Sequence, residues 1–204
     1  MKNLIVIVFI NLALQGCATT TKASPKTLGE QQATHTPSGS QATLPNQDTK
    51  KLIDLLQSKA EKGNPIALYH LGNIYAEGVG DIKKDPALSI MYFKQSAERG
   101  HAKAQYNIGA SYKLGDGLPQ SNKDAKIWYE KAASQGYADA QVQLGLIYLD
   151  TEPRTALKWF QAAAMQGSTD GQFLLASMYI RGEGVPQNQA EAYVWMSIAA
   201  ASGD

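Results

Sequence analysis

The chain has 204 residues, of which 44% are hydrophobic, and its 19 basic and 18 acidic residues give a formal net charge of +1. A chain of this length forms one or two domains. Nucleic-acid partners require a clustered cationic surface, and no block of Lys and Arg occurs here, so we expect no nucleic-acid partner.

The N-terminus has the pattern of a secretory signal peptide. Lys2 places a positive charge ahead of a short apolar run over residues 4–14. This run is too short to cross a bilayer as a helix, which takes about twenty residues. A basic start, a brief apolar stretch and small residues after it are typical of a cleaved signal. We therefore predict that residues 1–16 are a signal peptide and take no part in the fold.

The junction Leu14-Gln15-Gly16-Cys17 resembles the bacterial lipobox, although Gln15 stands where a small residue is usual. The resemblance implies that Cys17 becomes the first mature residue and carries lipid. Cys17 is also the only cysteine of the sequence, so the chain cannot form an internal disulfide. An unmodified cysteine within an uncleaved anchor is the alternative interpretation.

A lipid at Cys17 would hold the protein at a membrane, because acyl chains contribute about 0.8 kcal/mol per buried CH₂ group. The next residue is Ala18 rather than Asp. By resemblance to the lipoproteins of Gram-negative bacteria, this favours the outer membrane, on its periplasmic face. Residues 17–48 are rich in Thr, Ser, Gln, Pro and Gly and have no apolar period. We expect a disordered tether here, after the lipidated cysteine.

The folded part begins with residues 49–63, which carry apolar residues at helical spacing. This segment resembles the second helix of a repeat whose first helix is missing, and we predict an N-terminal capping helix. Beyond it, glycines recur at intervals of 31 to 37 residues, a period typical of helical-repeat proteins. The glycines are Gly63, Gly100, Gly136, Gly167 and Gly203. They divide residues 64–204 into four units, 64–100, 101–136, 137–167 and 168–203.

Each unit begins with a helix in which two small residues, an apolar residue and an aromatic residue share one face. The four sets are Ala67-Leu71-Gly72-Tyr75, Ala104-Ile108-Gly109-Tyr112, Ala140-Leu144-Gly145-Tyr148 and Gly171-Leu175-Ala176-Tyr179. A glycine within a helix costs about 1 kcal/mol relative to alanine. Its recurrence predicts that a neighbouring helix lies too close for a Cβ atom.

The second helix of each unit carries an aromatic residue, then alanine, then the closing glycine. Asp85-Pro86 is typical of a helix start, with Asp as the N-cap and Pro at the first helical position. Gly-x-Gly turns that need positive φ lie between the helices at residues 78–80, 115–117 and 182–184. The third unit lacks this turn and passes through residues 150–153 into its second helix. We expect this deletion to leave the stack intact.

These units resemble Sel1-like repeats, a branch of the tetratricopeptide-like helical repeats. The resemblance implies an all-α fold, a right-handed α/α solenoid of helical hairpins. It also implies protein binding, in envelope assembly, exopolysaccharide secretion or host interaction. Two alternatives stay open at the C-terminus, because either the last hairpin is its own cap or a partner covers it.

Candidate catalytic and ligand-binding groups are scarce. His35, His70 and His101 do not form a metal-binding spacing, and the sequence has no Gly-x-Ser-x-Gly nucleophile motif. The Gly-x-Gly turns lack the Gly-Lys-Ser/Thr ending of a phosphate-binding loop and follow no predicted strand. We therefore expect no enzyme activity, metal, cofactor or small-molecule substrate.

The remaining candidate is the surface of the first helices, which line the concave side of such a solenoid. Positions opposite their packing face predict a partner-binding set. The set is Tyr69, His70, Asn73, Tyr106, Asn107, Lys113, Val142, Leu146, Phe173 and Ser177. One column within it consists of Tyr69, Tyr106, Val142 and Phe173. This column is either an exposed apolar ridge suited to binding or packed against the adjacent hairpin, and the sequence leaves both alternatives open.

Together, the lipobox and the repeats predict a membrane-anchored periplasmic scaffold or adaptor. We expect it to hold an unknown protein of the cell envelope on its concave face. One alternative is an immunity protein that neutralises a periplasmic toxin. Another is a cell-wall hydrolase, which would need clustered carboxylates. Glu77, Asp81 and Asp116 are better explained as solvated turn residues.

Overall fold

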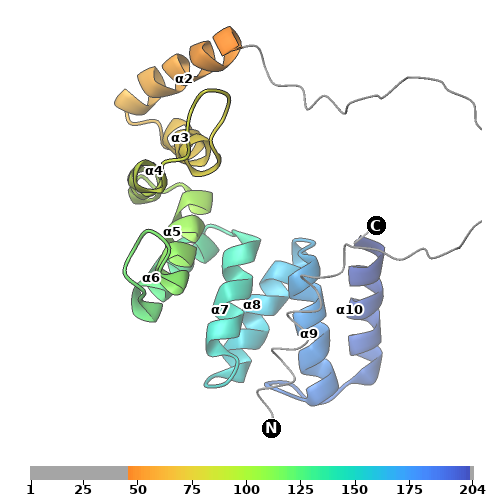
Figure 1. The fold of residues 1–204 in the computed structure, drawn as a ribbon. Coiled ribbons are helices and arrows are strands. Elements are labelled where there is room, and N and C mark those ends of the chain that lie inside the picture. Colours follow the sequence, from red (N-terminus) through yellow and green to blue (C-terminus); the bar gives the residue numbers. More distant parts are fainter. Residues whose placement is uncertain (1–45, 203–204) are drawn as a thin grey trace, which may run out of the picture. The chain divides into compact units, whose positions relative to one another are not determined.

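The computed structural model describes residues 46–202, which belong to one compact unit, residues 41–204. The predicted signal peptide, Cys17 and nearly all of the predicted tether lie outside the described residues, as do Gly203 and Asp204. The described part of the chain forms nine helices and no strand (Figure 1). The prediction of an all-α helical-repeat fold is therefore confirmed.

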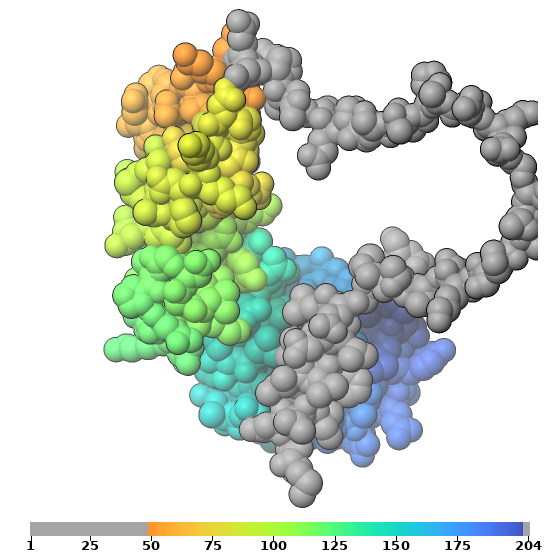
Figure 2. Space-filling view, viewed as in Figure 1, coloured from red at the N-terminus to blue at the C-terminus, as the bar shows by residue number. Residues whose placement is uncertain are grey.

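The helices follow one another as a helix and four hairpins. In chain order they are α2 Asn46–Glu61, α3 Pro65–Glu77, α4 Pro86–Glu98, α5 Ala102–Leu114, α6 Asn122–Ser134, α7 Ala138–Tyr148, α8 Pro153–Met165, α9 Thr169–Arg181 and α10 Gln189–Ser202. Each helix packs against the next, and α7 also contacts α9. The space-filling view shows the colours in sequence order along this array (Figure 2). The segment expected to be an N-terminal cap is α2, which packs against α3.

Side-chain caps begin several of the helices. Asp85 lies before α4 and its Oδ1 accepts a hydrogen bond from the Leu88 N–H at 2.9 Å, with Pro86 in the first turn. This confirms the predicted helix start. The Asn64 side chain caps α3 in the same way, accepting from two backbone N–H groups at 3.0 Å. Such caps satisfy N–H groups that have no partner inside the helix.

The described glycines at the unit ends and in the three Gly-x-Gly turns all have positive φ, as predicted. Gly100 illustrates the reason. Its φ is 89°, and its N–H donates to the Ala97 carbonyl at 3.0 Å. The following N–H, of His101, donates to the Ser96 carbonyl at 3.2 Å. The glycine thus lets the chain reverse at the end of α4 while the last carbonyls of the helix stay bonded.

The glycines within the first helices make room for aromatic rings of the second helices. A Cβ on Gly72 would lie 2.5 Å from Phe93 Cδ1, and a Cβ on Gly109 would lie 2.8 Å from Tyr129 Cδ1. Gly145 faces the Phe160 ring in the same way. The predicted close approach is confirmed, and its cause is a ring wedged between the two helices of the hairpin.

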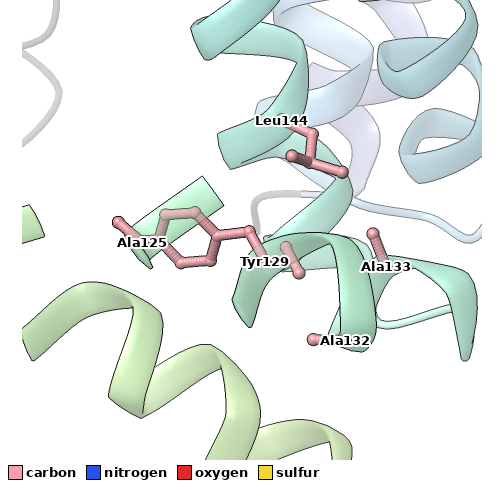
Figure 3. Close-up of a cluster of buried hydrophobic side chains, with 6 residues drawn as sticks. Ala125, Tyr129, Ala132, Ala133 and Leu144 are labelled. Atoms are coloured by element: carbon pink, nitrogen blue, oxygen red, sulfur yellow. The ribbon is translucent and has the colours of Figure 1, made fainter. Parts of the chain in front are cut away.

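The core between the second and third hairpins shows the same principle (Figure 3). Tyr129 of α6 lies at its centre and is 1% exposed. The buried residues of this cluster are Ala125, Tyr129, Ala132, Ala133, Ala140 and Leu144. Burial, and to a smaller extent Tyr106, raise the pKa of Tyr129 well above its ordinary value. One large ring among alanines therefore fills the gap between hairpins.

The third hairpin lacks the Gly-x-Gly turn. In each of the other three hairpins, the second glycine of this turn lies close to the first part of the helix that precedes the hairpin in the chain. The approaching pairs are Gly80 with Thr49, Gly117 with Ile90 and Gly184 with Pro153. In the third unit Lys126 lies at the equivalent place on α6, and its Nζ is 4.4 Å from the centroid of the Tyr148 ring. The stack stays continuous, because α7 still packs against both α6 and α8.

Candidate protein-binding face

The predicted partner-binding residues all lie on α3, α5, α7 and α9, the first helices of the hairpins. Each of these helices is anchored by one apolar residue that is at most 1% exposed. These anchors are Leu71, Ile108, Leu144 and Leu175. Eleven residues taken from the positions one or two before and two or five after each anchor form what we call the first-helix face. We define it as Tyr69, His70, Asn73, Tyr106, Asn107, Lys113, Gln143, Leu146, Phe173, Ser177 and Ile180.

Exposure differs widely between the predicted residues. Phe173 is 47% exposed, and His70 is exposed as well. Most of the others are half-buried, namely Tyr69, Asn73, Tyr106, Asn107, Lys113, Leu146 and Ser177. Val142 is only 5% exposed. At Val142 the alternative of packing is therefore the one realised, because its short side chain lies inside the packing where α7 contacts its neighbours.

The two tyrosines of the column pack against the start of the following hairpin. The Tyr69 ring stacks on His101, with 4.6 Å between centroids, and contacts Phe93 at 5.7 Å. Tyr106 meets Tyr137 edge-on at 5.3 Å. Both alternatives that the sequence left open are thus realised in one column, because the tyrosines join hairpins together while Phe173 is exposed.

The ionisable groups at this edge of the face are engaged in structural contacts. Burial, and then Asp139 and Asp170, raise the pKa of Tyr106, so its hydroxyl stays protonated. Burial and a hydrogen bond with Asp139 likewise raise the pKa of Tyr137. Burial, with smaller effects of His70 and Lys103, lowers the pKa of His101. Its neutral ring is suited to capping α5, where Nδ1 accepts from the Ala104 N–H at 3.3 Å.

Lys113 joins the first helices of two hairpins. Its Nζ donates to Gln143 Oε1 on α7 at 2.7 Å. The Lys113 side chain is half-buried, and this burial lowers its pKa. The contact places a positive charge in the middle of the first-helix face.

Sequence reasoning missed a set of buried glutamines beneath this face. Gln105, Gln141 and Gln172 are 2% to 5% exposed. Their Nε2 atoms donate to the carbonyls of Ala97, Ala133 and Ala164 at 3.1, 3.4 and 3.3 Å. Oε1 of Gln105 and of Gln141 also accepts from a glutamine after the second helix, at 2.7 and 2.8 Å. The available signal was a glutamine at the same register in three successive units.

The fold defines a helical-repeat protein. Among residues 46–202, no group of three or more His, Cys, Asp and Glu side chains is placed to hold a metal ion. In the same range, no helix combines the length and apolar character that crossing a membrane takes.

The chain belongs to the Sel1 repeat family. The family pattern matches residues 65–101, 102–137, 138–168 and 169–204, each within one residue of a unit predicted from the glycines. Sel1 repeats are protein–protein interaction scaffolds, and proteins built from them are in general not catalysts.

Two solved structures resemble this chain in sequence and fold. One is the protective antigen c5321 of uropathogenic Escherichia coli, with 36% identity over 74% of this chain and 33% of that one, at a TM-score of 0.70. The other is a Sel1 repeat protein from Oxalobacter formigenes, with 31% identity over 74% of this chain and 45% of that one, at a TM-score of 0.69.

A eukaryotic protein is similar to part of the chain as well. The chitin synthase regulator SKT5 of Malassezia restricta is 32% identical over 100 residues, which is 48% of this chain and 7% of that protein. The chain therefore spans less than half of the length of each of these three proteins.

Proposed function

We propose that this protein is a scaffold of the bacterial cell envelope that holds a protein partner on its first-helix face. The observation that carries the proposal is the pair Phe173 and Ile180 on α9, which are 47% and 41% exposed. They lie two helical turns apart with Ser177 between them, so they share one side of the helix. Large apolar side chains in such an exposed row are typical of interaction sites.

The polar groups on and beside this face support binding rather than chemistry. His101 caps a helix, Tyr137 bonds with Asp139, and Lys113 bonds with Gln143. Each of these groups already has a partner within the protein. We therefore assign the face a binding role without catalysis.

Membrane attachment is the second part of the proposal and rests on the sequence around Cys17. Lipid on this residue would place the repeats at the periplasmic face of the outer membrane. Radiolabelled fatty acid fed to producing cells should enter the natural protein and be absent from Cys17→Ala. Label in both proteins would defeat the proposal of a lipid anchor while leaving the binding face untouched.

The partner-binding proposal is tested by photo-crosslinking in intact cells. A photoreactive amino acid replaces Phe173 in one variant and Ile127 of α6, which is 40% exposed, in a matched control. The Phe173 variant should form a discrete cross-linked species that the Ile127 variant lacks. Equal cross-linking at both positions would show that the first-helix face has no special role.

A charged residue on the face should prevent binding, which complements the cross-linking test. Phe173→Asp should abolish the cross-linked species formed from a second probe at Ile180. Its thermal melting should stay close to that of the natural protein, because about half of Phe173 is exposed to solvent. Retained cross-linking in Phe173→Asp would contradict the proposed face.

A further inference from the structure

Lys113 differs from the residues that occupy its register in the other hairpins. It lies five positions after the buried anchor of α5, and the equivalent residues are Ala76, Leu149 and Ile180. All three are apolar. The first-helix face thus carries one ammonium group in a column that is otherwise apolar.

This ammonium has no counter-ion among the residues that the structure describes. Its described hydrogen bond is to the neutral amide of Gln143, at 2.7 Å. Two ion pairs of the described residues, between Lys126 and Glu130 and between Arg181 and Glu183, do not involve it. Burial is the cause of the lowered pKa of Lys113, with no charged neighbour contributing to it.

A half-buried charge without a counter-ion is unfavourable for folding. An apolar side chain of similar length would fill the same space without the loss of hydration, as the residues in the other hairpins do. The charge at Lys113 therefore does not contribute to the stability of the stack. A residue that is unfavourable for folding and lies on a binding face is a candidate for recognition.

The bond between Lys113 and Gln143 also determines which groups face an incoming partner. An ammonium group only donates, so Gln143 must turn its carbonyl oxygen towards Nζ. The Gln143 NH₂ group then points away from the bond and makes no hydrogen bond with the described residues. The pair consequently presents N–H donors from both side chains, while the Gln143 oxygen is turned towards Nζ. A carboxylate matches this arrangement, because it accepts hydrogen bonds and is negatively charged.

Two apolar residues lie near the pair in the sequence. Leu114 adjoins Lys113 in the sequence and is 72% exposed, and Leu146 of α7 is half-buried one turn beyond Gln143. A segment bound here would contact these side chains on either side of its acidic group.

We propose that Lys113 and Gln143 form a carboxylate-binding site that accepts an Asp or Glu side chain, flanked by apolar residues, from a peptide segment of the partner protein. This inference rests on the proposed function of the first-helix face. It adds the chemistry of the partner, which the exposed apolar residues leave undefined.

The test uses the full chain and a display library of random twelve-residue peptides. The natural protein should enrich peptides with Asp or Glu beside apolar residues, and Lys113→Met should lose this acidic preference. Lys113→Arg should keep it. Lys103→Met, which removes an exposed charge from the same helix, is the matched control and should select as the natural protein does. Enrichment without acidic residues, equal loss in Lys103→Met, or no enrichment would overturn the proposal.

A selected peptide then gives a quantitative test, whose first step uses only the natural protein. Replacing its Glu by Gln should weaken binding to the natural protein at least ten-fold, because hydrogen bonds between charged groups are lost. The same change should have little effect on binding to Lys113→Met, since the two changes remove one interaction. Equal losses in both proteins would contradict the site.

These outcomes are separable from a failure of the proposed function. Some peptides could reduce cross-linking of the partner at Phe173 and yet bind Lys113→Met as well as the natural protein. Such peptides would overturn the carboxylate site and leave the binding face in place. Lys113→Met should also melt at the same or a higher temperature than the natural protein. A lower melting temperature would contradict the argument that the charge is unfavourable for folding.

Discussion

Replacing Gly145 by alanine provides a sharp test of the packing inside each hairpin. Alanine favours the helix by about 1 kcal/mol relative to glycine. The added Cβ, however, would lie 2.5 Å from Cδ1 of Phe160, a residue that is 0% exposed. A ring enclosed on all sides cannot move away, and overpacking of this kind costs about 1–3 kcal/mol. Because the ring is fully enclosed, we take the upper part of this range, about 2–3 kcal/mol. After the helical gain of about 1 kcal/mol, we expect Gly145→Ala to destabilise the protein by about 1–2 kcal/mol.

Urea unfolding followed by circular dichroism measures this change. A loss of this size should lower the urea midpoint by about 0.5 M or more. The fourth hairpin supplies the control, because it has Ala176 where the others have glycine and Met196 where they have a ring. In a Phe160→Met background, Gly145→Ala should thus be neutral or stabilising. An increased midpoint in the natural background would refute the reasoning, since it would mean that the ring shifts freely.

Two further predictions concern pH and the buried glutamines. Because burial lowers the pKa of folded His101, the unfolded chain binds more protons, and stability is lost as pH falls through the ordinary histidine pKa of about 6.5. Melting temperatures between pH 7.5 and 5 should show this decline, and His101→Asn, which copies the Asn64 cap of α3, should reduce it; an unchanged decline would exclude His101. Gln141→Leu breaks two hydrogen bonds, whereas Gln172→Leu breaks one and removes an Oε1 that has no partner. In urea unfolding, Gln141→Leu should therefore lower the free energy of unfolding by about 1 kcal/mol more than Gln172→Leu does. Equal losses in the two variants would contradict this assignment.

The fold could be predicted because its determinants are local and repeat. A glycine such as Gly72 can be recognised as a packing residue from the sequence. Glycine is unfavourable within a helix, so its presence there indicates a close neighbour, here the Phe93 ring. The turn glycines and the Asp85 cap are similarly determined by their nearest neighbours. Such features recur in phase, so each unit confirms the interpretation of the others.

Exposure on the first-helix face could not be predicted, because it depends on the next hairpin. Tyr69 and Phe173 have the same register, yet Tyr69 is stacked by His101 while Phe173 is 47% exposed. Val142 is too short to reach past its neighbours and is buried. Helical spacing indicates the direction of a side chain but not what stands opposite it.

The glutamines show a different limit. Gln105 and Gln141 read as surface residues in a helix, because glutamine is mostly exposed in proteins. Their burial depends on free carbonyls at the end of the preceding second helix, such as that of Ala97. These carbonyls become visible only when the hairpins are stacked.

Because the third hairpin lacks the Gly-x-Gly turn, its surface differs from that of the other three hairpins. α7 has 11 residues, whereas α3, α5 and α9 have 13 each. In an array of equal units, a partner that follows the helices could bind equally well after sliding along by one hairpin. Here such a slip would bring a Gly-x-Gly turn to the place where the short connection between α7 and α8 had been. The deletion thus breaks the translational symmetry of the array and allows an extended partner only one alignment.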